Sequence, residues 1–467
     1  MTLDSTLVNI ESVSEVVLPE DFQVAFCGHK QNGHLTQETT SSGVQNGFLG
    51  NILGDKTHTP LPFKGLSYSV YGWCVQIWKP DATGKAWPKC VWIKYHTSPE
   101  GTSLTWATDQ DGKPSVYSPG AYINNRSLMP CQEPPVAMST WQASIHVPEG
   151  CVVLMSGNQF VGKTTGSDDQ VTYHYEMDSP LPCSTLALAV GWWQCRQSMN
   201  ADTKDGSNPD VPVTCRLYAP PSLIDRAADE LLGYAPKFLE ASCELLGPYP
   251  FRRLDMLILP KCFACMGLKS PNLVFLSQSL LSGDASMRVR LAHEISHAWF
   301  GLLVGAKDWN EEWLSEGFAT FIEEKIQSKA EKLYPQLKQL RGVSGQSDTI
   351  RPHTVVQFGQ MCSRKWTQVH YLKGYFLLHR MASIVGLEEF DEFLFNYVQH
   401  FKGQLVTSED FFGFFVESFS NVPREMKDKF VHEWLERAGL PKSFPKKFDS
   451  PDNELVSQVE NEVGGNR

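Results

Sequence analysis

The sequence predicts an α+β protein of several domains, in which an antiparallel, β-rich N-terminal domain precedes a mostly α-helical domain. Two observations carry this prediction. Short apolar or alternating runs rich in Val, Tyr and Trp fill residues 66–218, and Gly, Pro and Asp separate them, which is typical of β-hairpins. From Pro221 onward, apolar residues recur at spacings of three and four, which is typical of amphipathic helices.

The domain boundaries follow from the same patterns. Residues 1–65 are expected to be partly disordered or irregular, because they hold little apolar pattern and residues 31–60 are rich in Asn, Gly, Ser, Thr and Gln. Residues 66–218 form the β-rich domain, with runs such as YSVYGWCVQIW, TWQASIHV and VTYHYEM as strands. Residues 219–445 form the helical domain, and the polar, acidic residues 446–467 form a disordered tail.

Two helices of the second domain carry start signals. Asn310 is the expected N-cap of one helix, because Glu311 and Glu312 follow it, where carboxylates suit the positive end of the helix dipole. Thr407 is the expected N-cap of another helix, with Asp410 three residues later.

Composition narrows the classes of function and partner. The 467 residues carry a formal net charge of -11 with 42 % hydrophobic residues, which indicates a folded chain and predicts no nucleic-acid partner. The N-terminus lacks a basic and apolar leader, and no apolar run reaches the ~18 residues that would span a membrane. We expect a monomer in the cytoplasm, with the nucleus or nucleolus as alternatives, and with its 12 cysteines reduced.

The stretch HEISH carries the strongest chemical signal. His293 and His297 are four residues apart, so they share one face of a helix and can bind the same zinc ion. Glu294 lies beside them and can act as a general base toward an attacking water molecule. The alternative is a pair of histidines on an ordinary core helix.

A third ligand is needed, and Glu316 is the candidate. Eighteen residues separate it from His297. It lies in EEWLSEGFATFIEE between apolar residues, where a carboxylate without a partner is costly to bury. A helix, a loop over residues 304–309 and a second helix allow an antiparallel return of Glu316 to the histidines. The set predicts one catalytic zinc ion per chain.

At this point the chain resembles the gluzincin aminopeptidases of the M1 type. HEISH with its distant Glu, SLMPCQEPPVAMSTW, NEEWLSEGFAT and VHYLKGYFLL are all similar to stretches of that family, over about residues 73–440. The resemblance implies a saddle-like β domain, a thermolysin-like catalytic domain, and a small mixed sheet with LDMLILP as one strand and NLVFL as its edge. It also implies that the enzyme removes N-terminal residues from peptides.

The resemblance implies a role for Tyr371 as well. In this family, the Tyr of a Tyr-x-Lys-Gly stretch stabilises the oxyanion, and residues 371–374 match that stretch. Negative charge builds on the carbonyl oxygen during attack, and a phenol donor meets it. Without the resemblance, a Tyr in such an aromatic helix would be assigned to the core.

One family motif is altered here. The family carries Gly-x-Met-Glu-Asn, whose Glu binds the substrate's α-amino group, and residues 266–270 align with it. Gly267 keeps a backbone position for substrate, but Lys269 stands in place of the Glu, and Ala121 stands near the position of a Gln that assists in several relatives. Two ammonium groups ~4 Å apart would repel by about 4 kcal/mol at an effective dielectric of ~20. The alternative function is therefore a zinc-binding pseudo-peptidase that binds peptides without turnover.

The family also predicts more chain than is present. Its members start earlier in the β domain and continue into a C-terminal helical-repeat domain, so we expect a truncated form or an incomplete gene product.

Two further motifs are weak. Residues 157–164 fit the P-loop pattern G-x-x-x-x-G-K-[ST], but an alternating strand follows in place of a helix, so a hairpin loop is expected in place of an NTPase site. Cys262 and Cys265 fit C-x-x-C, but no second pair accompanies them, so they are expected to be ordinary thiols.

Overall fold

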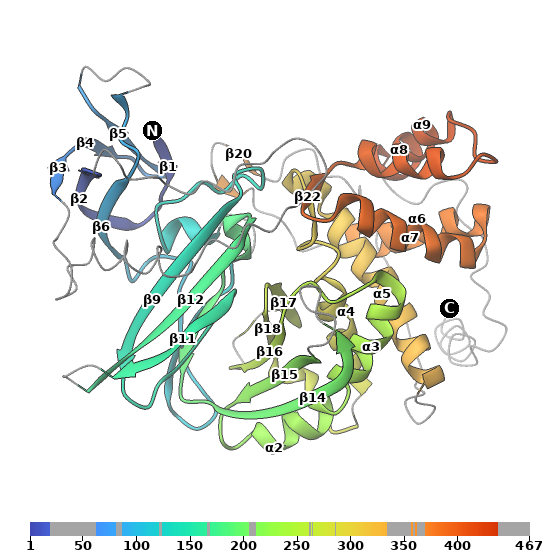
Figure 1. Cartoon of the computed structure of the whole chain (residues 1–467), viewed down its shortest axis with the longest axis horizontal. Helices are drawn as coiled ribbons and strands as arrows, with labels where there is room; N and C mark the ends of the chain where they lie inside the picture. The colour runs from blue at the N-terminus through green and yellow to red at the C-terminus, as the bar shows by residue number, and fades with distance from the viewer. Residues whose placement is uncertain are drawn as a thin grey trace, which may run out of the picture. The chain divides into compact units, whose positions relative to one another are not determined.

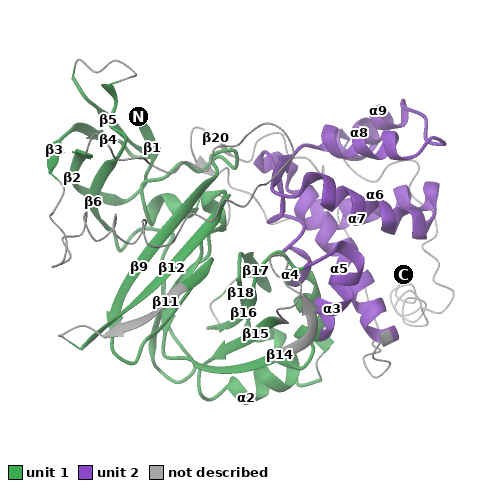
Figure 2. Cartoon of the chain, viewed as in Figure 1, with its two compact units in different colours: residues 1–236, 249–294, 356–362 green, residues 237–248, 295–355, 363–467 purple. Residues whose placement is uncertain are grey.

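The computed structural model describes most of the chain as two compact units (Figure 2). Unit 1 holds residues 1–236, 249–294 and 356–362, and unit 2 holds residues 237–248, 295–355 and 363–467. Within them, the described residues are 1–18, 62–80, 86–120, 124–165, 169–204, 212–260, 263, 265–284, 286–333, 356–357, 360–361 and 369–437.

Antiparallel sheets build the N-terminal part of unit 1 (Figure 1). One three-stranded sheet has the order β1 (Thr2–Asp4), β5 (Cys74–Trp78), β4 (Ser67–Val70). A second has the order β3 (Phe63–Gly65), β2 (Val8–Val16), β6 (Val91–Thr97). Two larger ones have the orders β10 (Val152–Met155), β13 (Leu188–Gly191), β8 (Pro114–Ser118), β7 (Thr105–Thr108) and β11 (Asn158–Thr165), β12 (Gln170–Leu181), β9 (Ser139–Pro148). The predicted β-rich N-terminal part is confirmed.

A five-stranded mixed sheet ends unit 1. Its order is β14 (Gln194–Lys204), β15 (Pro212–Ala219), β16 (Arg253–Leu259), β18 (Leu273–Ser277), β17 (Gly267–Ser270). Strands β15, β16 and β18 are parallel, whereas β14 and β17 are antiparallel to their neighbours. The predicted mixed sheet with LDMLILP as a strand is present, but NLVFL is not its edge. The chain turns at Asn272, whose φ is 65°, so that β17 pairs with β18 and becomes the edge strand.

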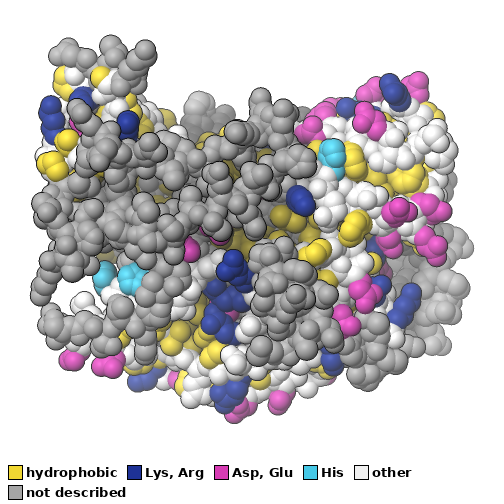
Figure 3. All heavy atoms as spheres, in the orientation of Figure 1, with side chains coloured by type: hydrophobic (Ala, Val, Ile, Leu, Met, Phe, Trp, Pro, Cys, Tyr) yellow, Lys and Arg dark blue, Asp and Glu magenta, His cyan; other side chains and the backbone are white. Residues whose placement is uncertain are grey.

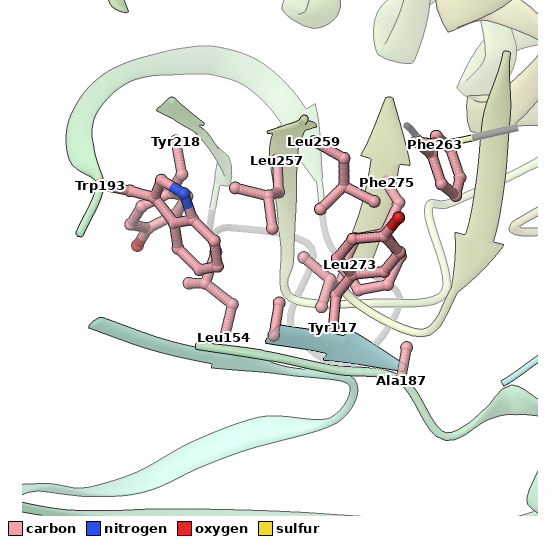
Figure 4. Close-up of a cluster of buried hydrophobic side chains, with 11 residues drawn as sticks. Tyr117, Leu154, Ala187, Trp193, Tyr218, Leu257, Leu259, Phe263, Leu273 and Phe275 are labelled. Carbon is pink, nitrogen blue, oxygen red and sulfur yellow. The ribbon is translucent and has the colours of Figure 1, made fainter. Parts of the chain in front are cut away.

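One face of the mixed sheet packs on the antiparallel sheets. Leu257 and Leu259 of β16 and Leu273 and Phe275 of β18 alternate along their strands, so their side chains leave the same face. Figure 4 shows them in one buried cluster with residues from the neighbouring strands. Its other members are Tyr117, Leu154, Ala187, Ala189, Trp193, Tyr218 and Phe263. Each large side chain buried in this way stabilises the fold by about 1.5–3 kcal/mol.

A buried ion cluster joins β15 and β16. Asp255 is 1 % exposed and accepts two hydrogen bonds from Arg216, both at 2.6 Å, and one from Arg253 at 2.8 Å. Arg253 also donates to the carbonyl oxygen of Gly157, at 2.7 Å. The single carboxylate therefore compensates two guanidinium groups inside the protein.

Unit 2 is mostly helical. Its helices include α5 (Trp313–Leu333), α6 (Val369–Val385), α7 (Leu387–Phe401), α8 (Ser408–Ser418) and α9 (Met426–Phe430), the last followed by a short helical segment over Val431–Glu436. Strands β19 (Val304–Ala306) and β22 (Gln404–Val406) pair in parallel. Other described elements include α2 (Ile224–Ala227), a helical segment over Ala228–Leu232, α3 (Ala235–Leu246), β20 (Val356–Gln357) and β21 (Gln360–Met361).

An aromatic core holds α5 against its neighbours within unit 2. The ring of Phe318 lies 4.9 Å from that of Phe300, 5.0 Å from Phe411 and 5.9 Å from Tyr397, measured between ring centroids. The indole of Trp313 adds a hydrogen bond of 2.9 Å to the hydroxyl of Ser408. These contacts fix the first turns of α5, in which Glu316 lies.

Helix and strand boundaries correct three sequence expectations. Asp308, not Asn310, caps the segment before α5, because its carboxylate accepts a hydrogen bond from the backbone N–H of Asn310. Residues 157–164 do not form a hairpin loop: from Asn158 onward they lie in β11, paired with β12. The first 18 residues hold β1 and β2, whereas residues 19–61 lie outside the described part. Thr407 caps α8 in a capping box with Asp410, as expected.

The described surface mixes charges of both signs. On the face drawn in Figure 3, acidic and basic side chains are interspersed with exposed apolar ones. Trp106, on β7, is 71 % exposed. None of the described helices combines the length and the apolar character needed to cross a membrane.

We predict that Asp255→Ala lowers the free energy of unfolding by about 2–4 kcal/mol, because it leaves the half-buried Arg216 and Arg253 without their carboxylate. Urea unfolding followed by circular dichroism measures the change. Asp255→Asn keeps the volume and some acceptor capacity, so its effect should be smaller. A loss below about 1 kcal/mol for the Ala variant would contradict the assigned role of the cluster.

Candidate active site

Helix α4 (Val289–Ser296) and the turn after it carry both predicted histidines. His293 and Glu294 lie in the last turn of α4, and His297 follows directly, where backbone hydrogen bonds from residues 298–300 tighten the chain. His293 therefore lies within α4, and His297 lies in the turn directly after the end of the helix. All three side chains are buried, at 5 %, 7 % and 2 % exposure.

The imidazole of His297 has a fixed orientation. Its Nδ1 lies 2.9 Å from the carbonyl oxygen of Phe300, and because a carbonyl only accepts, Nδ1 carries the proton. The hydroxyl of Ser315 lies 3.3 Å from the same carbonyl oxygen. With the proton on Nδ1, the Nε2 atom carries the lone pair, which is the usual arrangement of a metal-binding histidine.

Glu316 meets this Nε2 atom. It lies in the first turn of α5, is 8 % exposed, and places Oε2 3.2 Å from Nε2 of His297. One ligand atom each from His293, His297 and Glu316 lie within 4.8 Å of one another. The predicted return of α5 therefore brings together the three residues that the sequence singled out.

The donor set suits a small divalent metal ion. A carboxylate oxygen and an imidazole lone pair 3.2 Å apart in a buried site repel unless a cation or a proton lies between them. Tetrahedral zinc with bonds of about 2.0–2.1 Å would place neighbouring ligand atoms roughly 3.3 Å apart. The two-His, one-carboxylate set thus fits zinc in its chemistry, and the distance between His297 and Glu316 fits the expected spacing of two ligands.

Glu294 packs against the start of β17. A Cβ atom on Gly267 would lie 2.2 Å from Oε1 of Glu294, so only glycine leaves room for this carboxylate. Leu268 packs on the opposite side, against the buried cluster of Figure 4. Because side chains alternate along a strand, Lys269 lies on the same face of β17 as Gly267.

A glycine contact sets the position of Tyr371. A Cβ on Gly317 of α5 would lie 2.9 Å from Cα of Gly374 and 3.2 Å from the carbonyl oxygen of His370, both on α6. The turn of α6 that contains Tyr371 therefore runs directly beside the residue that follows Glu316. The half-buried Tyr371 ring lies 4.4 Å from the ring of His370, between centroids.

Sequence reasoning overlooked this pair of glycines. An isolated glycine inside a helix costs about 1 kcal/mol relative to alanine, so its presence is a signal of close packing. Gly317 in LSEGF and Gly374 in YLKGY both carried that signal. Ser315 and the Phe300 carbonyl were also overlooked, since a backbone acceptor leaves no trace in residue type.

Lys373 of the Tyr-x-Lys-Gly stretch has a structural partner. Its ammonium group is 3 % exposed and donates a hydrogen bond of 2.6 Å to the carbonyl oxygen of Arg437. Burial lowers the pKa of Lys373 from 10.5 to about 8. This lysine therefore ties α6 to the last described turn of unit 2.

The remaining sequence candidates lie elsewhere or outside the described residues. Ala121 and Cys262 are outside, while Cys265 packs against the buried cluster of Figure 4. The P-loop-like stretch continues into β11, so it opens no helix that could bind phosphate. Gly157 has a φ of 82°, and a Cβ there would lie 2.3 Å from the carbonyl oxygen of Glu176, which explains this glycine structurally.

Comparisons with known proteins agree with the fold. Residues 233–434 match the model of the peptidase family M1 domain. The chain is 37 % identical over 463 residues to aminopeptidase O of Rattus norvegicus, covering 84 % of this chain and 56 % of that protein. It is 30 % identical over 423 residues to aminopeptidase B of Rattus norvegicus, covering 86 % and 62 %. Its fold is similar to that of native yeast LTA4 hydrolase, with a TM-score of 0.70 and 19 % identity over 99 % of this chain and 66 % of the other.

Residues 233–434 of the chain therefore form a peptidase family M1 domain. The predicted fold class, with antiparallel sheets before a mostly helical catalytic part, is confirmed by this likeness to multidomain members. The chain spans little more than half the length of the curated relatives, 56 % for aminopeptidase O.

We predict that Gly317→Ala lowers the free energy of unfolding by about 1–3 kcal/mol, because its Cβ would press on the backbone of α6. Thermal unfolding measures the effect. Gly413→Ala in α8 is the matched control: nothing lies within 4 Å of its Cβ position, so the same substitution should stabilise by about 0.5–1 kcal/mol. Equal effects at the two sites would refute the close approach of α5 and α6.

The lowered pKa of Lys373 makes the free energy of unfolding depend on pH. Between pH 8 and 10.5 the unfolded chain holds a proton on this lysine that the folded chain has released, so stability rises with pH in that window. Lys373→Met removes this contribution. From the lower to the upper end of this pH window, the free energy of unfolding of the wild type should rise by roughly 3 kcal/mol relative to that of the variant. Urea unfolding at several pH values measures it, and a constant difference would count against the lowered pKa.

Proposed function

We propose that this chain is a zinc-dependent metallopeptidase that removes N-terminal residues from peptides. The observation that carries the proposal is the buried cluster of His293, His297 and Glu316. The relatives named aminopeptidase O and aminopeptidase B support the class of reaction. We further propose that the chain acts on peptides as a monomer in the cytoplasm.

His293, His297 and Glu316 would hold one zinc ion per chain. When bound, zinc supplies Lewis-acid chemistry, which polarises the peptide carbonyl and makes water a better nucleophile. The hydrogen bond of His297 Nδ1 to the Phe300 carbonyl supports this role, because it keeps Nε2 available as a ligand.

Glu294 would act first as general base and then as general acid. Its carboxylate takes a proton from the attacking water and passes it to the amine of the leaving peptide. Its burial and its contact with Gly267 support the assignment, because they hold the carboxylate at the start of the edge strand β17. An extended peptide can pair with such an edge.

Tyr371 would donate a hydrogen bond to the carbonyl oxygen as negative charge develops there. The contact between Gly317 and Gly374 supports this role, because it places the turn of α6 that contains Tyr371 beside the turn of α5 that contains Glu316. Gly267 would contribute backbone contacts to the substrate, and Lys269 would lie beside it.

A second candidate function is peptide binding without turnover. Lys269 favours it, because an ammonium group beside the site repels the free amino terminus of a peptide. The presence of both Glu294 and Tyr371 opposes it, because a binding protein needs neither a general base nor an oxyanion donor.

The proposal is tested with zinc-loaded protein and a peptide library in which each peptide has a free or an acetylated N-terminus. Cleavage restricted to free N-termini is the expected result. Cleavage of both forms would replace the aminopeptidase by an enzyme that needs no terminal amine. Peptide binding without cleavage, at one zinc per chain, would support the second candidate.

We predict that Glu294→Gln retains one zinc per chain but lowers kcat by at least about 100-fold, since only the proton-transfer group is removed. Metal analysis and peptide hydrolysis measure the two effects separately. Glu388→Gln, an exposed residue in the first turn of α7, is the matched control and should leave both unchanged. More than a few per cent of wild-type activity in the Glu294 variant would exclude it as the general base.

A further inference from the structure

The edge strand β17 offers a row of backbone groups to an extended peptide. It is the last strand of its sheet, and its one partner in that sheet, β18, lies on one side only. A peptide that pairs with β17 continues the sheet, and each of its side chains faces a neighbour on β17. The side chains of β17 therefore read the sequence of the bound peptide.

Lys269 lies on the face of β17 toward the reactive carboxylate. Gly267 meets Glu294 on that face, whereas Leu268 packs into the buried cluster on the other face. Residues two apart on a strand are roughly 6.5–7 Å apart. On a paired peptide, Lys269 therefore lies opposite a side chain about two residues from the position at which Glu294 would act on the cleaved bond.

The charge of Lys269 discriminates between substrate side chains. Directly opposed residues on paired antiparallel strands have Cβ atoms about 4.5–5.5 Å apart, within reach of an ion pair. Opposite charges at such a pair stabilise it and like charges destabilise it. A partly desolvated site strengthens both effects, and Lys269 is half-buried.

We propose that Lys269 is a specificity-determining residue that selects acidic peptides, namely those with Asp or Glu within two residues of the cleaved bond. This inference rests on the proposed function, because it assumes that peptides bind along β17. It assigns a substrate class to the same site, and Lys269 acts by pairing with a substrate carboxylate.

The experiment compares peptides that differ at one of their first four positions, with Glu, Gln or Lys at that position. Wild-type protein should prefer Glu over Lys by roughly tenfold in kcat/KM at one position. Lys269→Met should bring the ratio close to one, and Lys269→Glu should invert it. Lys64→Glu, on the exposed strand β3, changes the net charge equally and should leave the ratio as in wild type.

A binding readout separates this inference from the proposed function. The Kd values of the same peptides are measured by calorimetry on zinc-loaded Glu294→Gln protein, with and without Lys269→Glu, after circular dichroism confirms that both are folded. An acidic preference in Kd that inverts with Lys269→Glu supports the inference even if wild type cleaves nothing. The absence of any acidic preference, a preference that survives Lys269→Glu, or the absence of peptide binding overturns it.

Discussion

The burial of carboxylates beside imidazoles is the constraint on which the site depends. Glu294 and Glu316 are both less than 10 % exposed, and Glu316 lies 3.2 Å from Nε2 of His297. Burying such charges without compensation costs several kcal/mol, so the arrangement calls for a positive ion at its centre. The aromatic core around Phe318 and the hydrogen bond of Trp313 keep α5 in place against that electrostatic cost.

Three glycines allow the close contacts that set the positions of the site residues. At Gly267 the missing side chain makes room for the Glu294 carboxylate, and at Gly317 and Gly374 it lets α5 and α6 touch through their backbones. Gly267 contacts Glu294 itself, Gly317 directly follows Glu316, and Gly374 lies three residues after Tyr371. Larger side chains at these glycines would therefore displace Glu294 or separate α5 from α6.

Much of the fold and the metal cluster could be predicted from the sequence, and the misses share one cause. Periodicity identified the strands and helices, and the spacing of His293 and His297 with Glu316 identified the cluster, because local patterns report local structure. The edge of the mixed sheet was misassigned, since β17 pairs with β18 only after a turn at Asn272 that no periodicity reveals. The glycine contacts depend on which helices meet, which is decided by tertiary packing.

An open edge strand also carries a cost for the protein in solution. A strand that accepts peptide backbone can equally accept the same strand of a second molecule, which is how edge-to-edge association begins. In β17 a lysine occupies the centre of a four-residue strand, so two copies paired around that point would bring two ammonium groups together. The residue proposed to select peptides would thus also oppose the pairing of two β17 strands, and we expect an apolar side chain in its place to favour aggregation.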